Sequence, residues 1–285
     1  MSRTSLDRVK GPRRCIDYCH DAATAPESFR KTEGAWMDTS GVTQALILAG
    51  GQATRMRPYT DDAPKAMVPV AGTPIIGHQL LWLAAYGVKS VVVSGGYKAE
   101  VIIDYVGDGS RFGVEVTYAI EDEPLGRGGA LKYAARQLVD TEAPFFVLNG
   151  DVVSAFSPAD LADFHRRRDG AVTVALSPYR SNWGVADLDE QDRVRGFVQS
   201  PELPYWVNAG IYVFDPDVIS LLPDNGDHED NTFPQLAREG RLMGYRLSGY
   251  WRGIDTVKDV MDASRECRDS GSIPAAEFRT TDIDI

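Results

Sequence analysis

Apolar residues in the first half of the chain form short continuous runs, which alternate with longer segments whose apolar positions recur at helical spacing. The short runs predict strands over Ala45–Ala49, Val88–Val93, Val114–Ala119 and Pro144–Leu148. The longer segments predict helices over His78–Tyr86, Ala99–Val106, Ala130–Leu138 and Pro158–Arg168. Such alternation is typical of an α/β fold with a doubly wound, mostly parallel sheet.

The second half of the chain is richer in strands. Strands are predicted over Ala171–Leu176, Gly184–Leu188, Val194–Val198 and Val207–Phe214. Helices are predicted near Asp215–Leu222 and Thr232–Arg238, with a last helix from about Asp255. We expect these later strands to form a smaller mixed-sheet lobe. No repeat with a period of about 20 to 50 residues is present, which excludes a solenoid.

The two ends of the chain differ from the middle. Residues 1–40 combine basic residues with Ser, Thr, Gly and Pro and show no hydrophobic periodicity, so we expect a flexible N-terminal extension. One folded domain is expected over residues 41–269 and a short tail over 270–285.

Composition restricts the possible partners. The 285 residues are 43% hydrophobic and 25% charged, as in globular proteins with a large core. A net charge of −11 argues against a nucleic-acid partner, which would require an extended basic face. We expect no membrane segment, because no apolar run reaches about 18 residues. Three cysteines do not form a disulfide framework, which favours a cytoplasmic location.

A glycine pair follows the first predicted strand, in the run Leu48-Ala49-Gly50-Gly51, and Arg55 lies four residues further on. Glycines let the backbone approach a phosphate closely, and arginine adds charged donors. An ordinary strand-to-helix turn would explain the glycines alone equally well. The run is neither a P-loop nor a dinucleotide-binding triplet, which weakens kinase and dehydrogenase interpretations.

Three further charged side chains are candidate functional residues. Lys65 lies between prolines that stiffen its segment, although a solvated surface lysine is the alternative. Asp151 follows an apolar strand and is therefore expected at the carboxyl end of the sheet, where it is a candidate metal ligand or a simple turn residue. Asp255, taken alone, is expected to be a helix N-cap.

Two motifs in succession carry a resemblance. Leu-Ala-Gly-Gly-x-x-x-Arg-x-x-Pro and then Pro-Lys-x-Met-x-Pro-Val-x-Gly-x-Pro-Ile resemble the signature of the sugar-1-phosphate nucleotidyltransferases, also called sugar-nucleotide pyrophosphorylases. The resemblance extends from about Val42 to Arg268 and implies a Rossmann-like nucleotide-diphospho-sugar transferase fold. It implies that the Leu48–Gly51 loop contacts the nucleotide phosphates. It also implies catalytic roles for Arg55, at the departing pyrophosphate, and for Lys65, at the reacting phosphate.

The same resemblance implies the remaining ligands. Asp151 and Asp255 would hold Mg²⁺, which needs few protein carboxylates when phosphate oxygens and water complete its octahedron. The run Glu121–Ala130 resembles the family's nucleotide-base loop and is most similar to the mannose-1-phosphate and heptose-1-phosphate guanylyltransferase branches. GTP is therefore the expected nucleotide. The residues implied in nucleotide binding there are Glu123, Pro124, Gly126 and Gly128. Arg127 departs from the small residue usual in the family.

Family segments that line the acceptor are matched by Trp183, Gly184, Asn208 and Gly210. The family usually has Glu-Lys-Pro where this chain has Gln199-Ser200-Pro201, so two charges that hold the sugar and its phosphate are missing. Lys258 is a candidate replacement for the missing cation, with a solvated helix lysine as the alternative. The substitution also favours an unusual acceptor, such as a heptose, octose or cyclitol phosphate.

The predicted activity is therefore the joining of a nucleoside triphosphate to a phosphorylated sugar or cyclitol, with release of pyrophosphate. Two alternatives remain open at this point: a catalytically weak homologue that binds a sugar nucleotide and regulates a partner, and a cytidylyl or adenylyl transferase with another phosphorylated acceptor. A homo-oligomer is compatible with the sequence.

Overall fold

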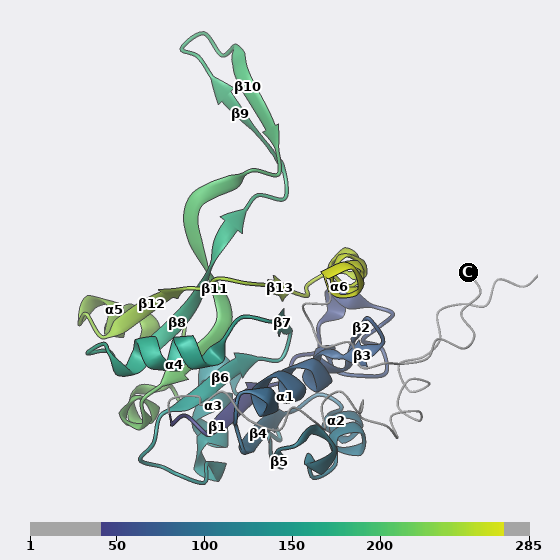
Figure 1. The fold of residues 1–285 in the computed structure, drawn as a ribbon, viewed down its shortest axis with the longest axis vertical. Helices are drawn as coiled ribbons and strands as arrows, with labels where there is room; N and C mark the ends of the chain where they lie inside the picture. The colour runs from purple at the N-terminus through teal and green to yellow at the C-terminus, as the bar shows by residue number, and fades with distance from the viewer. Residues whose placement is uncertain (1–40, 271–285) are drawn as a thin grey trace, which may run out of the picture.

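The computed structural model describes residues 41–270 (Figure 1). The extension predicted over residues 1–40 and the tail beyond residue 270 lie outside this range.

A seven-stranded sheet forms the centre of the molecule. Its strand order is β12-β8-β11-β6-β1-β4-β5. The bounds are β12 Leu242–Arg246, β8 Val172–Arg180, β11 Glu202–Phe214, β6 Phe145–Asn149, β1 Gln44–Leu48, β4 Ser90–Gly95 and β5 Glu115–Ile120. Only β11 runs antiparallel to its neighbours, whereas the other pairs are parallel. The prediction of a mostly parallel sheet is thus confirmed.

Helices cover both faces of the sheet, because its strands are apolar on both sides. In β1, Ala45 and Ile47 face a core shared with the helices α1 (Ile75–Ala85), α2 (Ala99–Val106) and α4 (Pro158–Arg166), whereas Leu46 faces a second core. That second core is covered by α3 (Gly126–Ala134) and α5 (Thr232–Arg238). The longest described helix, α6 (Val257–Ser270), has 14 residues, and no helix within residues 41–270 could cross a membrane.

Several elements differ from the predictions. Helix α3 begins at Gly126, four residues before the predicted Ala130, because its glycine-rich first turn resembles a loop in sequence. The helix predicted near Asp215–Leu222 is a 3₁₀ helix, η7 (Pro216–Leu221). The sequence also did not predict the edge strand β12 or several shorter elements. These are β2 (Pro69–Val70), β3 (Thr73–Pro74), β7 (Val152–Ser154), β13 (Trp251–Gly253) and the 3₁₀ helices η3 (Thr54–Met56), η4 (Lys65–Met67), η5 (Ser110–Phe112) and η6 (Ala135–Gln137).

The later strands do not form a separate mixed-sheet lobe, because β8 and β11 join the central sheet. β9 (Gly184–Leu188) and β10 (Val194–Gln199) instead form an antiparallel hairpin, which projects away from the body of the molecule (Figure 1). It is reached through the outer parts of β8 and β11, and its strand residues are mostly exposed. The hairpin turns over residues 189–193, where Asp192 has a left-handed φ of 61°. Ser200, with a left-handed φ of 52°, lies between β10 and β11, where the chain returns toward the body.

Candidate functional site

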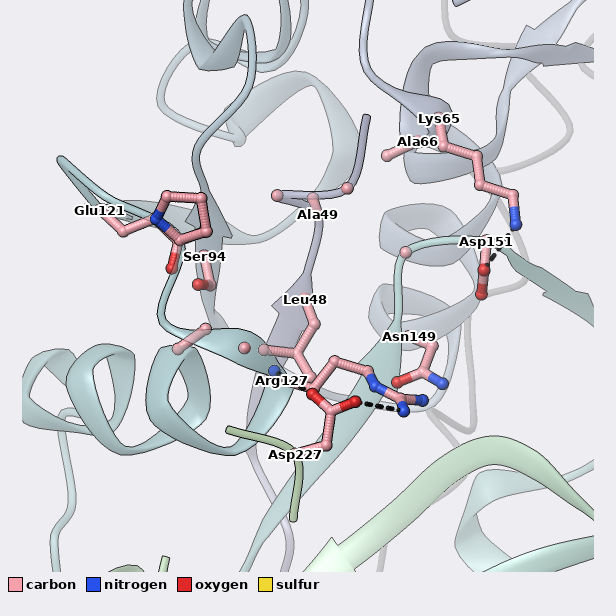
Figure 2. Close-up of a pocket in the computed structure, with 16 residues that line it drawn as sticks. Leu48, Ala49, Lys65, Ala66, Ser94, Glu121, Arg127, Asn149, Asp151 and Asp227 are labelled. Carbon is pink, nitrogen blue, oxygen red and sulfur yellow. Dashed lines mark hydrogen bonds and ion pairs between the residues drawn. The ribbon is translucent and has the colours of Figure 1, made fainter. Parts of the chain in front are cut away.

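A cavity opens where the parallel strands end. The carboxyl ends of β1, β4, β5 and β6 lie along one edge of the sheet, and the chain order reverses between β1 and β6, which is where open α/β sheets bind ligands. These strand ends supply the lining residues Leu48, Ala49, Gly50, Gly51, Ser94, Glu121, Asn149, Gly150 and Asp151 (Figure 2).

The glycine pair forms one wall of this cavity. A Cβ atom on Gly50 would lie 3.0 Å from Oε1 of Glu121, so a larger residue would crowd that carboxylate, whereas Gly51 faces open space. Neither glycine N–H has a hydrogen-bond partner in the part of the chain that the structure describes. Both can therefore donate to a bound anion, which favours a phosphate loop over an ordinary turn.

Four charged side chains meet beside the glycine loop. The ammonium Nζ of Lys65 lies 2.7 Å from Oδ2 of Asp151 and 2.8 Å from Oδ1 of Asp255. Arg55 is more exposed and lies 3.8 Å from the same Asp255 oxygen. Burial disfavours the charge on Lys65, but the two carboxylates outweigh burial and raise the pKa of Lys65 above its ordinary value. The structure thus brings together all four residues predicted for catalysis and metal binding.

The N-cap role considered for Asp255 is taken by its neighbours. The backbone N–H of Thr256 donates to Asp259 Oδ2 at 2.8 Å, and the Asp259 N–H donates to Thr256 Oγ1 at 3.3 Å. This reciprocal capping box begins α6. The side chain of Asp255 is therefore free to face Lys65.

The donor set of Asp151 and Asp255 fits a divalent cation. Both carboxylates lie within hydrogen-bond distance of one cationic atom, so their oxygens converge on one position. No group of three or more metal-ligating side chains occurs among the described residues. A hard cation such as Mg²⁺ takes its remaining ligands from phosphate oxygens and water, so two carboxylates are sufficient.

Glu121, rather than the predicted Glu123, lies in the cavity. Its Oε2 accepts a hydrogen bond from the Leu125 N–H at 3.2 Å, and burial raises the pKa of this carboxyl. No cation pairs with it among the described residues. Glu123 is exposed and does not line the cavity, whereas Pro124 does. The run of three acidic residues gave no signal to distinguish them, because which one faces inward depends on where β5 ends.

The glycines at the start of α3 divide into two groups. Gly126 lines the cavity as predicted. Gly128 lies outside it and donates its N–H to the carbonyl of Gly226 at 2.8 Å. A Cβ atom on Gly128 would lie 2.7 Å from the backbone nitrogen of His228, so this glycine allows the loop over residues 223–231 to pack against α3. Its predicted contact with the nucleotide has no support in the geometry.

The predicted acceptor residues are dispersed. Trp183, Gly184 and Gln199 lie at the foot of the β9–β10 hairpin, outside the residues that line the cavity, and Lys258 is exposed on α6. Two others lie on β11 behind the cavity. They are Asn208, whose side chain donates to Glu229, and Gly210, where a Cβ atom would lie 2.7 Å from Nδ2 of Asn149.

Three residues that sequence reasoning did not select complete the cavity region. Arg127 and Asp227 line the cavity, and Glu229 lies directly behind them. Arg127 was noted only as a departure from the family pattern. Asp227 and Glu229 come from a loop rich in acidic and polar residues, where no hydrophobic pattern indicates which side chains point inward.

In the sequence, His228 stands between Asp227 and Glu229. We expect its titration to affect the free energy of unfolding. His228 is fully buried against Tyr212, Phe214 and Phe233, and neither ring nitrogen has a partner among the described residues. Burial lowers its pKa from 6.5 to about 4. Below pH 6.5 the unfolded chain therefore binds a proton that the folded chain does not, and the free energy of unfolding should fall as the pH drops from about 7 to 4, by about 3 kcal/mol from this group.

The variant His228→Phe should flatten that decline, and urea unfolding between pH 7 and 4 measures it. His78, whose pKa burial also lowers, remains in the variant, so part of the slope is retained. A decline identical in the two proteins would contradict the assignment to His228.

A comparison of the sequence with protein-family models identifies the family. The model of the nucleotidyl transferase family matches residues 44–270. The chain belongs to this family. The match covers nearly all the described residues, including every strand end that forms the cavity.

Similar proteins agree with the assignment. The chain is 38% identical over 230 residues to a mannose-1-phosphate guanylyltransferase of Mycobacterium tuberculosis, covering 78% of this chain and 64% of that protein. It is 36% identical over 228 residues to a mannose-1-phosphate guanyltransferase of Yarrowia lipolytica, covering 78% and 63%. The chain thus spans slightly less than two thirds of the length of these relatives. HddC from Yersinia pseudotuberculosis shares the fold with a TM-score of 0.63 and 26% identity, over 79% of this chain and 99% of HddC.

Proposed function

We propose that this protein is a sugar-1-phosphate nucleotidyltransferase, which joins a nucleoside triphosphate to a sugar 1-phosphate and releases pyrophosphate. The observation that carries the proposal is the meeting of Gly50, Gly51, Lys65, Asp151 and Asp255 at one edge of the sheet. Free backbone donors, cations and a carboxylate pair are together what a phosphate-transfer site needs. Relatives named as mannose-1-phosphate guanylyltransferases support this reaction class.

In the proposed reaction, an oxygen of the acceptor phosphate attacks the α-phosphorus of the nucleotide. The bond from that phosphorus to the oxygen bridging to the β-phosphate breaks, and pyrophosphate leaves with the bond electrons. Gly50 and Gly51 position the triphosphate through their N–H groups, while Lys65 and Arg55 offset the charge that develops on it. No general base is required, because the acceptor phosphate is already ionised near neutral pH.

Asp151 and Asp255 would hold Mg²⁺ in this reaction. When bound, the ion would neutralise phosphate charge and orient the reacting groups. Lys65 contacts both carboxylates in the structure, so it keeps them together at the place where the ion would bind.

GTP is the proposed nucleotide, and Glu121 is the proposed base-reading residue. A carboxylate only accepts hydrogen bonds, and guanine presents two adjacent donor groups, N1–H and the N2 amino group, on its pairing edge. Uracil and thymine place carbonyl oxygens on both sides of a single N–H, so a carboxylate would repel them. HddC has been solved in complex with GMP-PN, which is consistent with a guanine nucleotide.

The acceptor is proposed to be a sugar or sugar-like 1-phosphate, and pyrophosphate release tests the whole proposal. Each nucleoside triphosphate is offered with Mg²⁺ against hexose, heptose, octose and cyclitol 1-phosphates. We expect release that requires both substrates and is fastest with GTP. A preference for CTP or ATP would overturn the choice of nucleotide. Absence of release from every pair would favour a sugar-nucleotide-binding regulatory homologue, which the uncharged Gln199 and Ser200 would permit.

A further inference from the structure

Arg127 is held at the cavity wall by two carboxylates. Its Nη2 lies 2.7 Å from Oδ2 of Asp227, its Nη1 contacts Oε2 of Glu229, and its own backbone N–H donates to Asp227 Oδ1 at 2.8 Å. Figure 2 shows the guanidinium extending from the start of α3 toward Asn149, with Asp227 beside it. The side chain is therefore fixed at both ends, which is the preorganisation that selective binding requires.

The support for Arg127 extends into the central sheet. Glu229 Oε1 accepts hydrogen bonds from Nδ2 of Asn208 at 2.8 Å and from the hydroxyl of Tyr212 at 3.2 Å. Tyr212 is fully buried, and Asn208 is tied to the backbone of Gly210. Asn208, which the sequence associated with the acceptor, thus acts on the cavity by positioning Glu229 and through it Arg127.

Arg127 lines the part of the cavity that the proposed nucleotide contacts leave for the acceptor. In the proposed function, Glu121 and Pro124 belong to the base, and the glycine loop, Lys65 and Asp151 belong to the reacting phosphates. Apart from Ser94 at the end of β4, the remaining polar side chains that line the cavity are Arg127, Asp227 and Asn149. An acceptor whose phosphate reaches the nucleotide would place the rest of its ring against this wall.

The charges of the cluster indicate what it can bind. One guanidinium with Asp227 and Glu229 carries a formal charge of −1, so a further anion is not favoured there. Arg127 lowers the pKa of Asp227, which stays ionised, whereas burial raises the pKa of Glu229 against the opposing effect of Arg127. A guanidinium has five N–H groups, and the two ion pairs engage only part of them. The remaining donors suit hydroxyl oxygens.

We infer that Arg127, positioned by Asp227 and Glu229, recognises ring hydroxyls of the acceptor and selects uncharged polyhydroxylated sugar 1-phosphates over those with a second anionic group. The inference rests on the proposed function. It assigns to Arg127 part of the acceptor recognition that Gln199 and Ser200, without charges and at the foot of the hairpin, do not supply.

Acceptor kinetics of Arg127→Ala test the inference. The probes are mannose 1-phosphate, its monodeoxy analogues and mannuronic acid 1-phosphate, or the same derivatives of whichever neutral acceptor proves best. The KM for the acceptor should rise about 10- to 100-fold, since a hydrogen bond to a charged group is lost. The KM for GTP should stay unchanged. A deoxy analogue that is poor for the wild type should become equal to its parent for the variant.

Three further variants separate recognition from structural support. Arg127→Lys keeps the charge but loses the planar fork, so it should not restore discrimination between the deoxy analogues. Glu229→Gln removes one negative charge and should shift the preference toward mannuronic acid 1-phosphate. Arg136→Ala, which removes an exposed arginine stacked on Tyr133 outside the cavity, should behave as wild type.

The possible failures are distinguishable. A wild type that releases no pyrophosphate with any substrate pair would remove the proposed function and this inference with it. An active wild type whose Arg127→Ala variant keeps the acceptor KM and its discrimination would overturn only the inference. Equal losses for GTP and acceptor would also overturn it, since they would indicate a structural role.

Discussion

The variant Asp151→Asn should lose about 10³-fold in turnover while remaining folded. Asp151 lies at the carboxyl end of β6 and shares Lys65 with Asp255 at distances of 2.7 and 2.8 Å. Asparagine keeps the shape but removes one of the two charges proposed to hold Mg²⁺, and losses of this kind commonly reach about 10²- to 10³-fold. Pyrophosphate release at saturating substrates measures the effect, and the Mg²⁺ concentration for half-maximal rate should rise.

A matched control is Asp217→Asn on η7. Asp217 pairs with Arg241 at 2.6 Å on the surface, away from the cavity, so its variant loses an ion pair but should keep full turnover. Thermal unfolding of both variants checks that they are folded. An Asp151→Asn protein with turnover within threefold of the wild type would exclude Asp151 from the proposed metal site.

The ion pairs of Lys65 also bear on how substrates bind. Lys65, Arg55, Asp151 and Asp255 together carry no net charge, and the raised pKa of Lys65 keeps its ammonium protonated at neutral pH. In the proposed function, a triphosphate that binds with a cation would compete for both partners of each ion pair at once. Lys65 can then exchange carboxylate for phosphate without leaving any of the charges unpaired, which lowers the cost of opening the site.

The parallel sheet, and the edge of it at which the cavity opens, could be predicted because buried strands have a simple sequence pattern. The runs that became β1 and β6 are continuous and apolar, and the residues that follow them, Gly50 and Asp151, necessarily meet at one edge. Lys65 begins the short 3₁₀ helix η4, and Asp255 lies in the loop between β13 and α6, so neither position follows from the pattern of the buried strands. Only the resemblance to a family placed them beside Asp151.

The cavity wall formed by Arg127, Asp227 and Asn149 could not be predicted, because its geometry depends on packing between distant segments. The N–H groups of Gly128 and Gly129 donate to the carbonyl of Gly226, which lies more than ninety positions later in the chain. This contact brings Asp227 to Arg127. Neither the glycine-rich turn nor the acidic loop has a sequence pattern that predicts this contact. Similarly, β12 was missed because it is an edge strand with little hydrophobic alternation, and it forms only by pairing with β8.

The choice between Glu121 and Glu123 provides the other large expected effect. Oε2 of Glu121 accepts the Leu125 N–H, so in Glu121→Gln the amide oxygen can keep that bond while the NH₂ group replaces the other acceptor oxygen. An amide donor there opposes the N–H groups of guanine and suits a carbonyl of uracil or thymine. We expect kcat/KM for GTP to fall about 100-fold and the preference for GTP over UTP to fall about 10³-fold. The reason is that a base which leaves a polar group of the site buried and unpaired binds much more weakly. Steady-state kinetics with the four nucleotides measure both ratios.

Glu123→Gln is the matched control for this prediction. Glu123 is two residues away and exposed, so its variant changes the same charge without touching the cavity and should keep the GTP preference. If Glu123→Gln instead shifted the preference and Glu121→Gln did not, the sequence-based choice of Glu123 would be restored. The loop after Glu121 would then have to rearrange when the nucleotide binds. If neither variant shifted it, the base would be read by backbone groups of the Pro124–Gly126 turn, which no side-chain substitution removes.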